Sequence, residues 1–217
     1  LNRGLFFFFQ GNNDIIKLGG TMKKIAILAL HLGYGGVEKS IAALANILCE
    51  KYKVEIICIY KLYDKPAFTI DERVKITYLI DSDLPVRVAS YKTLLFHGHF
   101  IKLAKKLTTD YFSKLKIVSF FKDGLSGIFM YPKRFSVMKK AISESDADIM
   151  ISTRTFLNEW LSVYGSQDML KIGWEHNHHH NNEKYAVDVV RSSKNLDYFV
   201  LVSKDLKKYY AKKLRKY

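Results

Sequence analysis

The sequence is poor in cysteine and proline, and each shortage narrows what the protein can be. The two cysteines among 217 residues, Cys49 and Cys58, sit in apolar contexts, so we expect reduced thiols and no disulfide framework. Three prolines, 12 glycines and 48% hydrophobic residues exclude a disordered or low-complexity chain. The length suits one well-buried core, or one domain with appendages.

Long hydrophobic runs are missing as well. No apolar run approaches the length of about 20 residues that spans a bilayer. The run "LFFFF" at residues 5–9 is too short for the core of a signal peptide, and no small-residue cleavage site follows it. The first methionine is Met22, directly before "KKIAILAL". We therefore interpret residues 1–21 as an upstream extension or a poorly ordered arm, and expect the domain to cover residues 22–217.

Acidic residues are the third shortage. Asp and Glu number 21 against 35 Lys and Arg, which gives a formal net charge of +14 and an isoelectric point of about 9.6. This balance favours an anionic partner, which could be nucleic acid, a phosphorylated ligand or an anionic membrane surface. Charge alone does not choose among them, but no helix-turn-helix, RRM or KH pattern supports nucleic acid. We do not expect a nucleic-acid partner.

What the sequence does contain is an alternation of strand and helix patterns. Residues 24–30 form a continuous apolar run, typical of a strand buried on both faces of a parallel sheet. Residues 37–52 then carry apolar side chains at helical spacing. Further strands are predicted at 53–60, 74–80, 147–153, 170–176 and 196–203. We predict mostly helix over 82–145, a short helix ended by Gly165, and a basic helix from residue 204 to the chain end. The fold class is therefore α/β: one Rossmann-like domain with a mainly parallel sheet.

The segment "HLGYGGVEKS", residues 31–40, places Gly33, Gly35 and Gly36 between the first strand and its helix. Open α/β sheets bind ligands at this edge, and the first N–H groups of the helix favour an anion such as phosphate. The other interpretation is a turn that only packs helix against strand. The spacing fits neither a dinucleotide fingerprint, because Lys39 takes the last glycine position, nor a Walker loop.

Two further features leave alternatives open. His176 and the neighbouring histidines 178–180 suggest zinc, but adjacent side chains in a loop point in different directions and no cysteine is near, so we predict no metal site. The span 85–140 is basic with interleaved aromatic residues. Such a span can lie on an anionic membrane, stack nucleobases, or place solvated lysines outside and core aromatics inside.

The ordered set of motifs over residues 22–210 resembles the family 4 glycosyltransferases, the retaining group with the two-domain GT-B architecture. Gly35, Gly36 and Glu38 match its Gly-Gly-x-Glu loop, and "ADIMIST" resembles its next conserved strand. "KIGWEHNHHH" resembles a strand that ends in a single histidine, here His176, and "LDYFVLVSKDL" resembles a later segment with Ser203 in place.

The resemblance implies transfer of a sugar from a nucleotide-sugar, with retention, to a glycan or lipid-linked acceptor in the synthesis of polysaccharide or cell-surface glycan. The nucleotide-sugar is then a substrate, and no cofactor is implied. Gly35 and Gly36 would admit the diphosphate, and His176, the catalytic candidate, would face the transferred sugar. Asn177 could add a hydrogen bond. Glu38 is either a substrate-binding residue or an acid that is favourable in the first turn of its helix.

The family's second Rossmann domain, which carries a Glu-x7-Glu motif and most nucleotide contacts, takes roughly 150 residues and is not in the 217 residues. We therefore expect the acceptor-side half of an enzyme, inactive alone, with the donor domain on the rest of the gene product or on a second chain. We expect it in the cytoplasm or peripheral on the inner face of the membrane. The alternative is a non-catalytic basic module that docks on an anionic membrane or a partner chain; a dinucleotide-dependent oxidoreductase is a weaker one.

Overall fold

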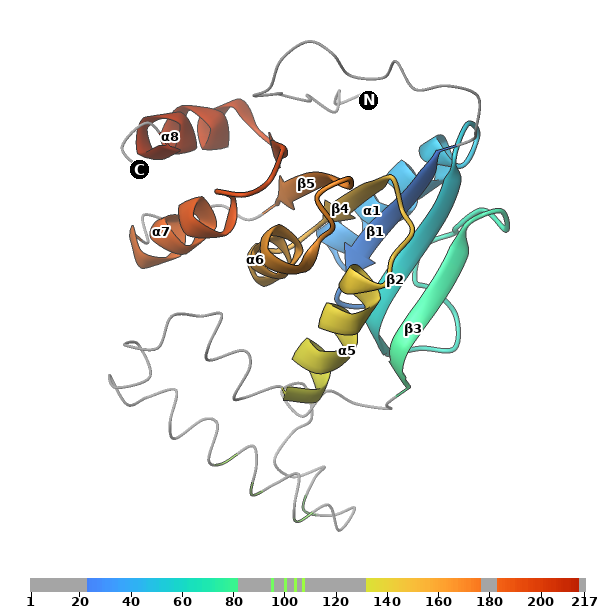
Figure 1. Ribbon diagram of the computed structural model, residues 1–217. Coiled ribbons are helices and arrows are strands. Elements are labelled where there is room, and N and C mark those ends of the chain that lie inside the picture. The colour runs from blue at the N-terminus through green and yellow to red at the C-terminus, as the bar shows by residue number, and fades with distance from the viewer. Residues whose placement is uncertain are drawn as a thin grey trace.

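The computed structural model describes residues 23–81, 132–176 and 183–214, together with the helical positions 95, 100, 104 and 107 (Figure 1). The strands are β1 (Lys24–Ala29), β2 (Lys53–Lys61), β3 (Lys75–Asp81), β4 (Ile149–Ser152), β5 (Leu170–Glu175) and β6 (Tyr198–Leu201). The helices are α1 (Gly36–Leu48), α5 (Pro132–Ser143), α6 (Thr155–Tyr164), α7 (Glu183–Ser192) and α8 (Lys204–Leu214).

The strands form a six-stranded sheet in the order β3-β2-β1-β4-β5-β6, and every neighbouring pair is parallel. The predicted α/β class and the predicted strands are confirmed. Ile27 of β1 pairs with Ile56 on one side and with Ile151 of β4 on the other. The chain builds outward from β1 in one direction and then from β4 in the other. The carboxyl ends of β1 and β4 are therefore the switch point at which open sheets form a ligand crevice.

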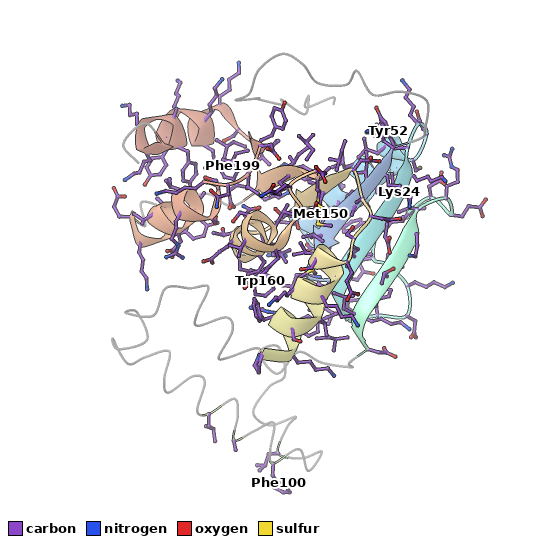
Figure 2. All side chains as sticks on the ribbon, viewed as in Figure 1. Lys24, Tyr52, Phe100, Met150, Trp160 and Phe199 are labelled. Atoms are coloured by element: carbon purple, nitrogen blue, oxygen red, sulfur yellow. The ribbon has the colours of Figure 1, made fainter. Side chains whose placement is uncertain are left out.

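The core has two layers because successive side chains of a strand point to opposite faces of the sheet. Ile27 of β1 faces α1, whereas Leu28 faces α5 and α6, and both are 0% exposed. Figure 1 shows α1 behind the sheet with α5 and α6 in front of it, and the labelled Met150 and Trp160 of Figure 2 belong to the front layer. Each such fully buried apolar side chain contributes about 1.5–3 kcal/mol.

Helix α1 is shorter than its sequence pattern indicates, because the chain must turn before β2. The amides of Lys51 and Tyr52 both donate to the carbonyl of Leu48, at 3.1 and 3.0 Å, and close the turn. The predicted helix that ends at Gly165 is α6, whose C-cap is Gly165. The predicted basic helix is α8. Helix α7 had no sequence prediction; its apolar residues pack with β6 and α8 in a third cluster.

Of the segment 82–145 that we expect to be mostly helical, α5 fits the prediction, and most of the remainder lies outside the described residues. The arm at residues 1–21 lies outside them as well. Among the described helices, none is both long enough and apolar enough to cross a bilayer.

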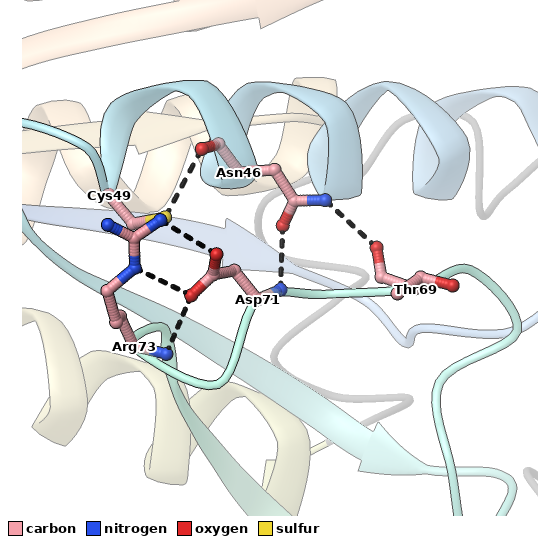
Figure 3. Close-up of polar contacts among 5 residues, drawn as sticks. All are labelled: Asn46, Cys49, Thr69, Asp71 and Arg73. Atoms are coloured by element: carbon pink, nitrogen blue, oxygen red, sulfur yellow. Dashed lines mark hydrogen bonds and ion pairs between the residues drawn. The ribbon is translucent and has the colours of Figure 1, made fainter.

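The connection from β2 to β3 is fastened to α1 by a polar clamp (Figure 3). The Asn46 amide donates to the carbonyl of Thr69 at 3.0 Å and accepts from the amide of Asp71 at 2.9 Å. The Arg73 guanidinium makes two bonds of 2.8 Å to Asp71 and holds the pKa of that carboxyl well below its usual range. Nearby Cys49 donates to the Asn46 carbonyl at 3.2 Å. Cys49 and Cys58 are both buried free thiols, as expected.

Candidate functional site

The loop that follows β1 is organised by His31. The amide of Gly33 donates to Nδ1 of His31 at 3.2 Å, so this ring nitrogen carries no proton and the proton of the neutral ring lies on Nε2. Burial lowers the pKa of His31; the Glu38 carboxylate opposes that shift and the Arg154 charge adds to it. His31 is therefore a neutral imidazole at pH 7 that can donate through Nε2.

Glu38 lies in the first turn of α1 with only 4% of its surface exposed. Arg154, at the N-cap of α6, donates from Nη2 to Oε1 of Glu38 at 2.7 Å. Nδ1 of His31 lies 3.6 Å from the same oxygen. These three residues connect the loops after β1 and β4 across the switch point. A fourth, Thr153, adds a hydrogen bond of 2.8 Å to the carbonyl of Leu28.

The two matched glycines of the loop differ in their surroundings. A Cβ on Gly35 would collide with Oε2 of Glu38 and lie 3.2 Å from its Cδ. The φ of Gly35 is 170°, an extended conformation that any residue adopts, so space rather than backbone strain requires this glycine. At Gly36, no atom of the described residues lies within 4 Å of the position of a Cβ, apart from the chain neighbours and the backbone of its own helix. Gly35 thus makes room for Glu38, whereas Gly36 borders open space at the start of α1.

His176 follows β5, at the same edge of the sheet. Its ring lies 4.2 Å from that of Trp174, centroid to centroid. Burial, and secondarily the positive charge of Arg154, lowers the pKa of His176 to about 4, so the ring is neutral at pH 7. Nε2 of His176 and Nε of Arg154 are among several buried side-chain polar atoms of the described residues that have no hydrogen-bond partner, and both follow strands that end at this edge. Buried polar atoms in native proteins are nearly always paired, so these two nitrogens indicate where a ligand or water would bind.

Glu175, the last residue of β5, is a fully buried carboxylate with 0% exposure. It accepts hydrogen bonds from Thr155 Oγ1 at 3.0 Å and from the Tyr185 hydroxyl at 2.9 Å. The two hydroxyls lie 3.3 Å apart. The carboxylate thus ties the first residue of α6 and the first turn of α7 to the end of β5, and fixes the backbone that leads into His176.

The structure brings Gly35, Gly36, Glu38 and His176 to one edge of the sheet, as the sequence predicts, and their roles in binding and catalysis stay predictions. Asn177 and the histidines at 178–180 lie outside the described residues. Within the part of the chain that the structure describes, no group of three or more His, Cys, Asp or Glu side chains could hold a metal ion.

Sequence reasoning missed His31, Arg154 and Glu175. The only available signal was their place directly after a predicted strand or at its end.

Comparison with known proteins gives a distant similarity. No family model matches the chain. The chain is 25% identical over 146 residues to the exopolysaccharide phosphotransferase SCO2592 of Streptomyces coelicolor. The matched stretch covers 65% of this chain and 14% of that relative, so the chain spans a small part of its length. The similarity and the parallel-sheet fold are compatible with a glycosyltransferase-like domain. Membership of family 4 and the GT-B architecture stay predictions.

Proposed function

We propose that this chain is the acceptor-side domain of a glycosyltransferase that takes part in the synthesis of a polysaccharide or cell-surface glycan. The observation that carries the proposal is the pair of unpartnered buried nitrogens, on Arg154 and His176, at the switch point of the sheet. Arg154 follows β4 and His176 follows β5, which are paired neighbours in the sheet, and the charge of Arg154 contributes to the lowered pKa of His176. The exopolysaccharide relative supports the pathway, although it shares only 25% identity over a part of its chain.

The first step of the argument is the phosphate. Helix α1 presents unpaired first-turn N–H groups and the positive end of its dipole at this edge. The open space at Gly36 lets a phosphate approach that backbone. Glu38 neutralises the charge on one side of Arg154 and fixes the orientation of its guanidinium. Nε of that guanidinium has no hydrogen-bond partner, and we assign it to the diphosphate of a nucleotide-sugar.

The second step is the sugar. A neutral His176 cannot add a positive charge, but its Nε2 can make one hydrogen bond to the donor sugar. In the proposed transfer, the bond from C1 to the diphosphate oxygen breaks and the acceptor oxygen bonds to C1. The proton of the acceptor hydroxyl passes to the departing diphosphate. Electrostatic stabilisation of that diphosphate is the largest contribution we expect from this half, and the donor domain would supply the remaining contacts.

The test is transfer of radiolabelled sugar by the complete gene product from a panel of UDP-, GDP- and dTDP-sugars. We expect Gly36→Val and His176→Ala to reduce transfer strongly while the thermal unfolding of Gly36→Val stays close to that of the parent. The matched control is Ile47→Ala, which changes an exposed side chain of the same helix. Transfer that is unaffected by both site variants would contradict the proposal.

The relative's name supports a second candidate, transfer of a phosphorylated sugar to the polysaccharide. Both reactions place a phosphate near Arg154, and the product separates them. Sugar-phosphate transfer from donors labelled with ³²P at the sugar-proximal phosphate leaves phosphorus in the polymer, whereas sugar transfer leaves it on the nucleotide.

The non-catalytic alternative, a module that docks on a membrane or partner chain, makes a different prediction. It requires binding to anionic vesicles that weakens with salt and does not depend on Gly36 or His176. The enzyme proposal, by contrast, includes a location in the cytoplasm or at the inner face of the membrane, and a donor domain on the rest of the gene product or on a second chain.

A further inference from the structure

Two large aromatic side chains are unusually exposed beside the candidate site. Tyr34, in the loop after β1, is 77% exposed, and Tyr63, in the loop after β2, is 53% exposed. Their ring centroids lie 6.1 Å apart at an interplanar angle of 74°, and the ring of Phe68 lies 6.3 Å from that of Tyr34. We call Tyr34, Tyr63 and Phe68 the aromatic platform. Adjacent aromatic side chains at a surface commonly mark a binding site.

The platform is held in place by the two loops that carry it. The ring of Tyr63 packs on Gly33, where an added Cβ would lie 3.0 Å from the Tyr63 Cε2 atom. The amide of Ala67 donates to the carbonyl of Leu32 at 2.9 Å and joins the loops. The Tyr63 ring and the backbone of the two loops are therefore held in place before any ligand binds, which lowers the entropic cost of binding. Because Tyr34 buries little of its surface, its contribution to folding is small.

The position of the platform relates it to the site. Tyr34 and Tyr63 lie on the loops after β1 and β2, on one side of the switch point, whereas Arg154 and His176 follow β4 and β5 on the other side. Gly36, the first residue of α1, follows Tyr34 by two positions, at the same edge of the sheet. A molecule on the platform and a nucleotide-sugar at Arg154 would therefore approach each other over the open space at Gly36.

We propose that the aromatic platform binds a sugar ring of the glycan acceptor. This inference rests on the proposed glycosyltransferase function. One face of a pyranose presents C–H groups that the neighbouring oxygens make partly positive, and the face of an aromatic ring carries the complementary negative charge. The tyrosine hydroxyls can bond the sugar hydroxyls at the rim. Asp64 and Lys65, which follow Tyr63 directly, are also exposed, so charged groups border the platform; this favours a polar sugar over a long acyl chain.

The experiment measures binding of hexasaccharides built from glucose, galactose or N-acetylglucosamine to the complete gene product, by ligand-observed NMR and calorimetry. We expect at least one of them to bind and Tyr34→Ala to weaken that binding about tenfold. Tyr34→Trp, which keeps an aromatic face, should retain it. Ile47→Ala, which removes a side chain that is 61% exposed in the last turn of α1, should leave binding unchanged.

Three results would overturn the proposal that the platform binds glycan. The first is that no hexasaccharide binds, and the second is that Tyr34→Ala and Tyr63→Ala bind the hexasaccharide as tightly as the parent. The third is that Tyr34→Ala weakens nucleotide binding instead of glycan binding. The parallel titration with UDP- and GDP-sugars keeps the two proposals apart. Nucleotide-sugar binding without glycan binding refutes the platform alone. Glycan binding that depends on Tyr34, with no nucleotide-sugar bound or transferred, refutes the proposed enzyme and leaves a glycan-binding module.

Discussion

Arg154 and Glu38 are 116 positions apart in the sequence, yet Nη2 of the arginine lies 2.7 Å from Oε1 of the glutamate. The glutamate is 4% exposed and the arginine side chain 24% exposed. The pair joins the start of α1 to the start of α6 over the carboxyl ends of β1 and β4. It fixes the candidate phosphate site without the help of a ligand.

Removing one partner of this pair should cost stability, because the other charge is left without compensation. We expect Glu38→Ala to lower the free energy of unfolding by about 3 kcal/mol. The matched control is Lys75→Ala, which breaks the pair of Lys75 with Glu55, where the lysine side chain is 71% exposed; it should cost less than about 1 kcal/mol. Urea unfolding of both variants measures the difference. Equal small losses would mean that the Glu38 pair is screened by solvent.

The two glycines before and within α1 should respond in opposite ways to alanine. Gly36→Ala meets no atom and removes a glycine from a helix, so it should stabilise the protein by about 0.5–1 kcal/mol. Gly35→Ala should destabilise it, because the added methyl group displaces the Glu38 carboxylate from Arg154. Thermal unfolding of the two variants side by side checks the sign. Loss of stability in Gly36→Ala would show that the space there is already filled by another part of the protein.

The sequence predicts the sheet well because each strand is a short apolar run that can be recognised without knowledge of its neighbours. The run at 24–30 is apolar throughout, and β1 is buried on both faces. Helix α7 had no sequence prediction, although Ala186, Val189 and Val190 stand at helical spacing. In the structure these residues pack in one cluster with residues of β6 and α8.

Of the candidate site, Gly35, Gly36 and His176 stand in motifs that the sequence shows, and their roles stay predictions. Arg154 and His31 become significant only when the fold brings the ends of β1 and β4 together, which no local pattern records.

Loss of the Tyr185 hydroxyl should destabilise the protein through Glu175. Tyr185→Phe removes one hydrogen-bond donor from a carboxylate that is 0% exposed, and a hydrogen bond to a charged group contributes about 1.5–3 kcal/mol. Tyr34→Phe is the matched control, since the ring of Tyr34 is 77% exposed and its hydroxyl can be replaced by water at no cost. Chemical unfolding curves of the two variants provide the comparison. A loss no larger in Tyr185→Phe than in Tyr34→Phe would contradict the assigned role of Glu175.

Stability should fall as the pH is lowered from about 7 to about 5, in part because of His176. The folded-state pKa of His176 is about 4, below the ordinary value of 6.5, so between these values the unfolded chain binds more protons than the folded one. The stabilisation is therefore fully present above the unfolded pKa and is lost as the pH falls toward the folded one. His31, whose pKa is also lowered, acts in the same direction. Asp71, Asp146 and Asp148 have lowered pKa values too, but they lose their contribution only at more acidic pH.

His176→Gln keeps a polar side chain without the titration, so its free energy of unfolding should depend less on pH in this window than that of the parent. An unchanged dependence would show that the imidazole of His176 titrates normally, and would remove the argument that it meets the donor sugar as a neutral group.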